Sequence, residues 1–217
     1  MKMGKLIVFE GPDTSGKTTT INKLKTALPI IFENEKFIFT REPGNLIRKG
    51  ENASEKIRKR LLTDDTLTAY NQAKLFAIAR KYHVKDIIKE LKAGNNVITD
   101  RFLLSSIVYQ GLELGKEKIM DLNKGTLELL SNENIEIHNI VLNINQKTYN
   151  NRMSRKEKDA LEKVDDFIVD ARLFFHSNKD FLEGLEIGKI YQVDANNTIE
   201  DTLIQSLNHI NEILKDN

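Results

Sequence analysis

The alternation of apolar and polar positions along the chain predicts short strands separated by helices. Five short runs are apolar at nearly every position, which is typical of strands buried on both faces of a sheet. Between them, apolar residues recur at helical spacing. The longest such stretch spans 70–93 and is followed by Gly94 and Asn95, which suit a helix C-terminus. Further helices are expected at 163–185 and 198–214. The expected strands are 5–10, 36–40, 96–100, 138–144 and 189–194.

Strands that alternate with helices predict an α/β fold, in which a five-stranded parallel sheet is covered by helices on both faces. The 217 residues suffice for one such domain and are too few for two, so we expect a single domain over 1–217. None of the three prolines falls inside a predicted helix. In parallel sheets of this kind ligands bind at the carboxyl ends of the strands, so polar residues that follow a strand are the candidates for function.

The first expected strand is followed by Gly-Pro-Asp-Thr-Ser-Gly-Lys-Thr, which matches the phosphate-binding pattern G-x-x-x-x-G-K-[ST] at every fixed position. The glycines let the backbone curl so that N–H groups point at phosphate oxygens, and the next helix adds its positive end. We expect Lys17 between the outer phosphates and the Thr18 hydroxyl on Mg²⁺. The alternative is a glycine-rich turn that matches by accident, and the strand and helix around it argue against this. The expected triphosphate-binding residues here are Gly11, Pro12, Asp13, Thr14, Ser15, Gly16, Lys17, Thr18 and Thr19.

Composition narrows the possibilities further. Apolar residues make up 40% and charged residues 30% of the chain, and the net charge is +1, so we do not expect a nucleic acid partner. The chain has no cysteine, which excludes disulfides and thiolate metal sites and agrees with a reducing compartment. We expect neither a signal peptide nor a membrane partner, because the first strand starts at once and no apolar run could cross a bilayer. A cytoplasmic location is the expectation.

Charged residues follow the second and third expected strands. Arg41 opens an Arg-Glu-Pro-Gly turn and is placed to meet an anion. Asp100 ends an apolar strand in a chain with a phosphate loop, which favours a role in the Mg²⁺ shell. The adjacent Arg101 could grip a phosphate with two N–H groups. The alternatives are a solvated charged turn at Arg41 and a surface salt bridge at Asp100 and Arg101.

Two helical segments also carry candidate chemistry. Phe76 and Arg80 are four residues apart and share one face of the expected 70–93 helix, where they could stack a base and bond a carbonyl or a phosphate. A core phenylalanine beside a surface arginine is the alternative. The segment 105–110 offers hydroxyls, a phenol and an amide on an expected helix.

The charged stretch 151–159 is typical of a lid that closes over phosphates, and equally of a solvated helix end. His83 and His138 have no companions at metal-ligand spacing, so we interpret both as structural.

In their order along the chain, these motifs resemble the thymidylate kinase family. Each short motif is weak alone, but the resemblance covers essentially the whole chain, and the shared order makes it specific. The matching segments are Phe9-Glu10-Gly11, 41–44, Leu75 to Arg80, Asp100-Arg101, 105–110, 152–158 and Asp194-Ala195.

The resemblance implies a P-loop nucleoside monophosphate kinase fold with a small lid at about 148–162. It further implies transfer of the ATP γ-phosphate to dTMP with Mg²⁺, which Thr18 and Asp100 would help to hold. Homodimers are usual in the family and are expected here. The implied catalytic residues are Asp13, Lys17, Arg101, Arg152 and Arg155.

The resemblance also assigns the sugar, phosphate and adenine contacts. Asp194 and Ala195 would border the adenine of ATP. Asp13 would bond the acceptor 3′-hydroxyl, while Arg41 and Arg101 would grip the acceptor phosphate.

On the base side, Phe76 would stack on thymine and Arg80 would bond its carbonyl edge, so Arg80→Ala is expected to weaken dTMP binding with little loss of stability. Ser106 and Gln110 would lie near the base, and Tyr109 would disfavour a ribose 2′-hydroxyl. The implied dTMP-binding residues are Asp13, Arg41, Phe76, Arg80, Arg101, Ser106, Tyr109 and Gln110.

In related enzymes a catalytic arginine lies either in the phosphate loop or in the lid. The loop here has no basic residue between its glycines, so stabilising charge on the transferring phosphoryl group is expected from the lid. Arg152 or Arg155 is favoured over the lysines there, because a planar guanidinium holds two phosphate oxygens at once.

The sequence departs from the family pattern at three places, where Asn45 follows Gly44, Phe102 replaces a common tyrosine and Asn143 replaces a common aspartate.

Two rival functions are a deoxynucleoside kinase and a GTP-dependent switch protein. A deoxynucleoside kinase would not need an arginine such as Arg41 after the second strand, because its acceptor carries no phosphate. A GTP-dependent switch protein would need Asn-Lys-x-Asp after a strand, whereas Asn123-Lys124-Gly125-Thr126 lacks the aspartate.

Overall fold

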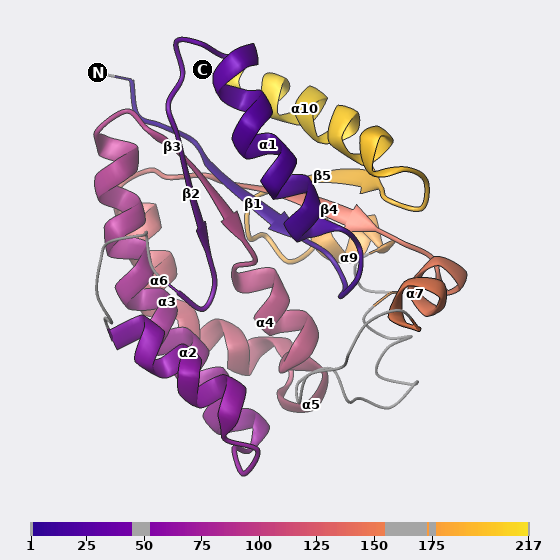
Figure 1. The fold of residues 1–217 in the computed structure, drawn as a ribbon. Coiled ribbons are helices and arrows are strands. Elements are labelled where there is room, and N and C mark those ends of the chain that lie inside the picture. The colour runs from indigo at the N-terminus through magenta and orange to yellow at the C-terminus, as the bar shows by residue number, and fades with distance from the viewer. Residues whose placement is uncertain (1, 45–52, 155–172, 174–176, 217) are drawn as a thin grey trace.

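Five parallel strands form the centre of the computed structural model, which describes residues 2–44, 53–154, 173 and 177–216. The strand order β2-β3-β1-β4-β5 puts β1 in the middle, so the segment that follows it has strands on both sides (Figure 1). The predicted parallel sheet is confirmed, with boundaries that move by one residue at most. The strands are β1 (Leu6–Glu10), β2 (Phe37–Arg41), β3 (Asn96–Asp100), β4 (Ile137–Asn143) and β5 (Lys189–Asp194).

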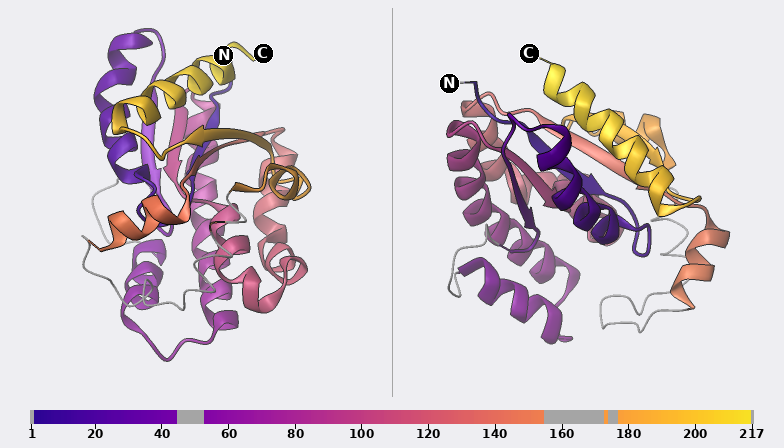
Figure 2. Two further views of the ribbon diagram at one scale, coloured as in Figure 1. Left: turned by 90° about the vertical axis from the view of Figure 1, so that its right-hand side faces the viewer. Right: turned by 45° about the horizontal axis from the view of Figure 1, so that its top comes forward.

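Helices cover both faces of this sheet, as the sequence predicts. Figure 2 shows α1 and α10 side by side on one face, while α3, α4 and α6 lie on the other. The helices of the described residues are α1 (Lys17–Ile31), α2 (Ala53–Thr63), α3 (Ala69–Lys92), α4 (Leu103–Tyr109), α5 (Gly111–Leu114), α6 (Lys116–Asn132), α7 (Gln146–Met153), α9 (Lys179–Glu183) and α10 (Ile199–Lys215).

The two faces of β1 feed two separate apolar cores, because successive side chains of a strand point to opposite sides. Leu6 and Val8 pack with residues of α3, α4 and α6. Ile7 and Phe9 pack with residues of α1 and α10. All four side chains are fully buried, so β1 is fixed from both sides and holds the loop after it in a constant position.

Two of the three expected helices are present in the structure. The expected 70–93 helix is α3, whose N-cap Thr68 accepts a hydrogen bond from the Asn71 backbone. The expected 198–214 helix is α10, which begins with a capping box between Thr198 and Asp201. Most of the expected 163–185 helix, including Phe167, Phe174 and Phe175, lies outside the described residues; Phe181, in α9, packs half-buried against the core.

Two features differ from the sequence-based expectation. Pro29 lies inside α1, contrary to the prediction that no proline falls within a helix. It stands in the last turn, where one lost backbone hydrogen bond can be tolerated next to the helix end. The helix α2 was not predicted, because five of the 11 residues of Ala53–Thr63 are charged and only Ser54 and Leu61 are buried.

Candidate active site

The loop after β1 has the backbone shape that a phosphate cradle requires. Gly11 and Gly16 have φ angles of 144° and 95°, and a Cβ on Gly11 would come within 2.5 Å of the Leu142 carbonyl oxygen. Thr14 also adopts a positive φ of 60°. Gly16 is the N-cap of α1, so the unpaired N–H groups of the first turn and the helix dipole lie at the loop. The predicted phosphate loop thus has the local geometry for binding an anion.

Lys17 is held inside this loop. Its Nζ donates to the carbonyl oxygens of Gly11 at 2.8 Å and Pro12 at 2.9 Å, and the residue is only 6% exposed. Burial and the nearby guanidinium of Arg101 lower the pKa of Lys17 to about 8, although the carboxylates of Asp100, Asp13 and Glu10 oppose the shift. The ammonium is therefore a preorganised cation whose charge depends on pH.

This pKa leads to a testable pH effect. With a pKa of about 8, the free enzyme has Lys17 about half deprotonated at pH 8 and about nine-tenths deprotonated at pH 9. Bound phosphates raise that pKa, so ATP binding should take up about half a proton at pH 8 and more at pH 9. Calorimetric titration with ATP in buffers of different ionisation enthalpy measures this uptake. A proton uptake that does not increase between pH 7 and pH 9 would contradict the buried ammonium.

Thr18 and Asp100 meet at the edge of the loop, as the sequence predicts. The Thr18 Oγ1 donates to Asp100 Oδ2 at 3.2 Å, while the buried Asp100 Oδ1 has no hydrogen-bond partner among the described residues. A hydroxyl and a free carboxylate oxygen are ligands that suit Mg²⁺, which protein sites often hold through one or two carboxylates together with substrate phosphates. This agrees with the finding that, within the described ranges, no three His, Cys, Asp or Glu side chains gather into an all-protein metal site. The residues present fit the metal.

Asp13, Arg101 and Tyr109 form a cluster next to the loop. The Arg101 Nη2 donates to Asp13 Oδ1 at 2.5 Å, and the Tyr109 hydroxyl donates to Asp13 Oδ2 at 3.2 Å. The Arg101 guanidinium also lies over the Tyr109 ring, 5.0 Å from its centroid. Arg101 has a positive φ of 68°, a strained conformation that turns the chain out of β3 at this point. The structure thus brings together three of the residues that the sequence analysis assigned to catalysis and dTMP binding.

Glu10 is a site residue whose role the sequence analysis missed. It ends β1 fully buried, and its carboxylate accepts hydrogen bonds from the backbone N–H groups of Phe102 and Ser105 and from the Ser105 hydroxyl. These contacts cap the start of α4. Burial raises the pKa of Glu10, although the bond from Ser105 and the charge of Arg101 oppose the shift. The one signal in the sequence is a carboxylate that ends an apolar strand.

Arg80 is buried rather than exposed. Only 2% of the residue is accessible, and its Nε donates to Glu42 Oε2 at 2.6 Å. Its Nη1 donates to Asn123 Oδ1 at 2.5 Å, and its Nη2 donates to the Phe102 carbonyl oxygen at 3.1 Å and to Ser106 Oγ at 2.9 Å. Four of its five N–H groups are thus used within the protein. The interpretation of Arg80 as a surface side chain is wrong.

The other base-side candidates lie around Arg80. Phe76 is half-buried one turn earlier in α3, on the same helix face. Ser106 is buried in α4, where its hydroxyl contacts Arg80. Gln110 is half-buried at the C-terminus of α4, one residue after Tyr109.

Arg41 stands exposed at the end of β2, with a second arginine close by. Arg58 of α2 donates from Nη1 to the Pro43 carbonyl oxygen at 2.8 Å. Burial and the charge of Arg41 lower the pKa of Arg58, which indicates two cations beside the same turn. The sequence analysis missed Arg58 because it did not predict α2, and residues 45–52, which follow Gly44 in the chain, lie outside the described residues.

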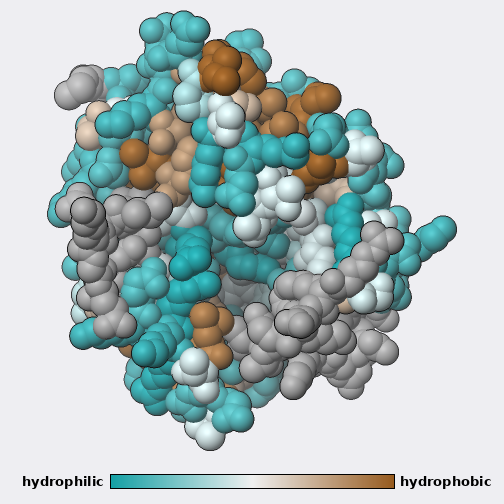
Figure 3. Space-filling view, viewed as in Figure 1, coloured by the Kyte–Doolittle hydropathy of each residue, from teal (hydrophilic) through white to brown (hydrophobic). Residues whose placement is uncertain are grey.

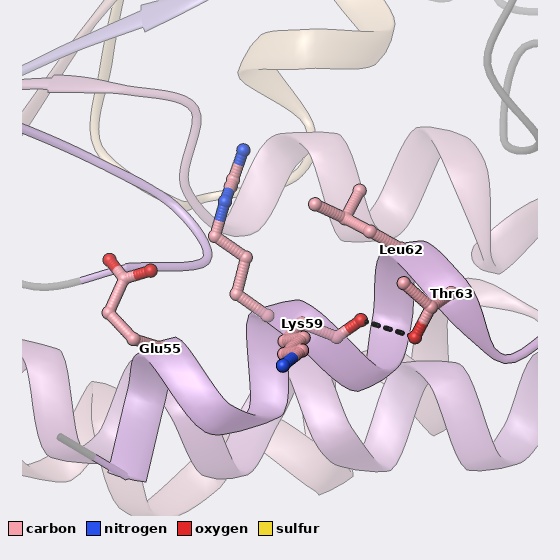
Figure 4. Close-up of a pocket in the computed structure, with 5 residues that line it drawn as sticks. Glu55, Lys59, Leu62 and Thr63 are labelled. Carbon is pink, nitrogen blue, oxygen red and sulfur yellow. Dashed lines mark hydrogen bonds between the residues drawn. The ribbon is translucent and has the colours of Figure 1, made fainter. Parts of the chain in front are cut away.

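An open groove of about 430 Å³ runs along α2 next to this turn. Figure 4 shows Glu55 and Leu62 projecting from α2, with Thr63 donating its hydroxyl hydrogen to the Lys59 carbonyl oxygen. Arg58 also lines the groove, so its side chain borders an accessible space beside the turn.

Arg152 joins the phosphate loop to the loop after β5. Its Nη1 donates to the Thr14 carbonyl oxygen at 3.1 Å, and its Nη2 donates to the Ala195 carbonyl oxygen at 2.8 Å. Asp194, which ends β5, is exposed next to the buried Ala195. The other expected lid arginine, Arg155, lies outside the described residues, as does most of the charged stretch 151–159.

All of these groups lie at the carboxyl ends of β1, β2, β3 and β5, in the first turn of α1, or on α2, α3, α4 and α7 nearby. Figure 3 shows a hollow below the ends of β1 and β3, and its visible walls are mostly hydrophilic. A parallel sheet in the order β2-β3-β1-β4-β5, with a glycine loop after the central strand, defines a P-loop nucleotide-binding protein of the α/β class.

Comparisons with known proteins identify the family. A sequence model of the thymidylate kinase family matches residues 9–205. The chain is 32% identical over 209 residues to the thymidylate kinase of Limosilactobacillus reuteri (strain DSM 20016), covering 80% of this chain and 96% of that protein. It is 31% identical over 223 residues to that of Ligilactobacillus salivarius (97% and 99%), and 35% identical over 171 residues to that of Mycoplasma genitalium (77% and 76%). The chain belongs to the thymidylate kinase family, and the resemblance in its motifs is confirmed.

Proposed function

We propose that the protein transfers the γ-phosphate of ATP to dTMP and releases ADP and dTDP. Family membership supports this reaction, and the rival functions are not favoured. In the transfer, an oxygen of the acceptor phosphate forms a bond to the γ-phosphorus while the bond to the β,γ-bridging oxygen breaks. The observation that carries the proposal is the position of the phosphate loop and the acceptor-side arginines around the carboxyl ends of adjacent strands.

On the donor side, the phosphate loop and Lys17 would bind the phosphates of ATP. Backbone N–H groups of the loop and of the first turn of α1 would hold the phosphate chain, and the Lys17 ammonium would neutralise charge on its outer oxygens. Thr18 and Asp100 would hold Mg²⁺, which supplies further positive charge at the phosphates.

On the acceptor side, Arg41 and Arg101 would bind the dTMP phosphate, and we add Arg58 because it lies beside Arg41. Arg101 contacts Asp13 in the structure, which links the group that grips the acceptor phosphate to the carboxylate expected on the 3′-hydroxyl. Phe76 would stack on thymine and Arg80 would bond its carbonyl edge. Ser106 contacts Arg80, and Tyr109 and Gln110 follow at the C-terminal end of α4.

Two structural observations weigh against the rival functions. Arg41 and Arg58 put two cations at the turn after β2, which suits an acceptor that carries a phosphate better than an unphosphorylated nucleoside. Asn123 lies inside α6 and is bonded to Arg80, so the Asn-Lys segment is not a guanine-binding motif at a strand end.

The decisive experiment is a coupled ADP-release assay with ATP and each natural nucleoside monophosphate. The proposal requires the highest kcat/KM for dTMP. Activity confined to unphosphorylated nucleosides would favour a deoxynucleoside kinase, and GTP hydrolysis without an acceptor would favour a switch protein.

The catalytic lid arginine stays a prediction. Arg152 and Arg155 are its candidates, and Arg152 contacts the phosphate loop through Thr14. Replacing the catalytic arginine with Ala should lower kcat about 10²–10³-fold while leaving the KM for dTMP nearly unchanged, because that contact forms with the transferring phosphoryl group. Parallel kinetics of Arg152→Ala and Arg155→Ala identify which one acts. Unchanged kcat in the double variant would rule out both.

Three further expectations stay predictions. They are one domain over 1–217 with a lid at about 148–162, a homodimeric assembly and a cytoplasmic location. Among the described helices, none is long and apolar enough to span a membrane.

A further inference from the structure

Asn123 is a buried polar residue of α6 that no part of the proposed mechanism uses. It is 2% exposed, and its Oδ1 accepts a hydrogen bond from Arg80 Nη1 at 2.5 Å. Its Nδ2 donates to the Ile119 carbonyl oxygen at 2.8 Å. The second bond fixes the amide orientation, because a flipped amide would turn two N–H donors toward the Arg80 donor. Asn123 therefore presents an oxygen to Arg80 in a fixed direction.

This contact determines where the remaining Arg80 donor points. Three of the five guanidinium N–H groups are bonded to Glu42, the Phe102 carbonyl oxygen and Ser106, and a fourth is bonded to Asn123. Within the described part of the chain, the second hydrogen of Nη1 is the N–H that has no hydrogen-bond partner. Because the guanidinium is planar, fixing one Nη1 hydrogen on Asn123 fixes the direction of the other.

The opposite side of Arg80 is supported in the same way. Glu42 is 7% exposed, and its Oε2 accepts from Arg80 Nε at 2.6 Å. His83 is 1% exposed, with Nδ1 at 3.5 Å from Glu42 Oε1 and Nε2 at 2.8 Å from Thr40 Oγ1. Glu42 and Asn123 thus hold Arg80 between the turn after β2 and α6.

We propose that Asn123 is a positioning residue for the acceptor base: it aims the one unused N–H of Arg80 at a carbonyl oxygen of the pyrimidine. The proposal rests on the proposed function, in which Arg80 bonds the carbonyl edge of thymine. A donor fixed in this direction favours thymine, which offers a carbonyl oxygen where cytosine offers an amino group. Asn123 then contributes to base discrimination without touching the base.

The test compares three variants at positions of α6. Asn123→Ala removes the acceptor for Nη1 and should raise the KM for dTMP about tenfold, with the KM for ATP within about twofold. The inhibition constant of dCMP in competition with dTMP should change much less. The ratio of the dCMP inhibition constant to the KM for dTMP, which measures the preference for thymine, should therefore fall. Asn123→Asp keeps an oxygen for Nη1 but loses the donor to Ile119, so it should lose stability and keep the KM for dTMP within about threefold.

Thr126→Val is the matched control, because Thr126 is equally buried one turn further along α6 and is not among the groups that hold Arg80. It should leave the KM for dTMP unchanged. If Asn123→Ala is not isolated as folded protein, Asn123→Ser takes its place. It should raise the KM for dTMP in the same way, because the serine side chain is too short to bring its hydroxyl to Arg80 Nη1.

The proposal is overturned if folded Asn123→Ala or Asn123→Ser binds dTMP as the wild type does, or if Thr126→Val raises the KM for dTMP equally. A failure of the proposed function would look different. In that case the wild-type protein itself would not turn over dTMP, or Arg80→Lys would leave the KM for dTMP unchanged.

Discussion

Lys17→Ala is expected to reduce kcat by about 10²–10³-fold while the protein stays folded. Its ammonium is fixed by two loop carbonyl oxygens, so its charge is in place before the transition state forms and needs no reorganisation. Replacing it removes a buried charge together with its two hydrogen bonds, and these opposite effects leave little net change in stability. Steady-state kinetics at saturating ATP and dTMP, with thermal unfolding of the same preparation, measures both quantities.

The control is Lys25→Ala, which removes an exposed lysine two turns further along α1. It should leave kcat unchanged. Near-normal turnover in Lys17→Ala would show that the loop does not neutralise phosphate charge, and the proposed reaction would lose its main support.

Arg80→Ala is expected to lose both stability and acceptor binding. Without Arg80, the carboxylate of Glu42 stays buried and keeps only the imidazole of His83 at 3.5 Å, and breaking a buried ion pair typically costs about 3–5 kcal/mol. For a chain of this size that corresponds to a drop in Tm of about 6–20 °C. In the protein that remains folded, loss of the bond to the base should raise the KM for dTMP about 10–100-fold. This replaces the expectation, drawn from the sequence, that the substitution costs little stability.

Arg80→Lys and Phe76→Ala separate the two effects. Arg80→Lys keeps a cation beside Glu42 but cannot make the forked contacts, so it should retain more of the stability and still bind dTMP poorly. Phe76 is half-buried, and Phe76→Ala should raise the KM for dTMP with a smaller loss in Tm. If Arg80→Ala had the same Tm as the wild type, that result would contradict the buried ion pair between Arg80 and Glu42.

The fold could be predicted from the sequence because its signals are local. Each strand is a short apolar run, and the glycine pattern depends on residues that are neighbours in the chain. The same holds for Thr18 and Asp100, which meet because both follow neighbouring strands of one parallel sheet. Position at a strand end was enough to predict these contacts.

The rest of the site depends on contacts that no local pattern records. Arg80 is buried because Glu42, Asn123 and Ser106 reach it from three other parts of the chain. Helical spacing placed Arg80 on the face of Phe76 but could not show whether other elements would cover it. Arg58 was missed for a related reason: α2 buries only Ser54 and Leu61, so periodicity gave no sign of the helix that holds it near Arg41.

The burial of Arg80 also limits how this family member could evolve. A protein can change its substrate preference gradually when the residue that reads the substrate stands alone at the surface. Here Arg80, the residue proposed to read the base, also ties the turn after β2 to α4 and α6, so a substitution that altered base preference would first cost the chain much of its stability. A lineage that acquired a new acceptor base would therefore need compensating substitutions at Glu42 and Asn123, and we expect these positions to change together with Arg80.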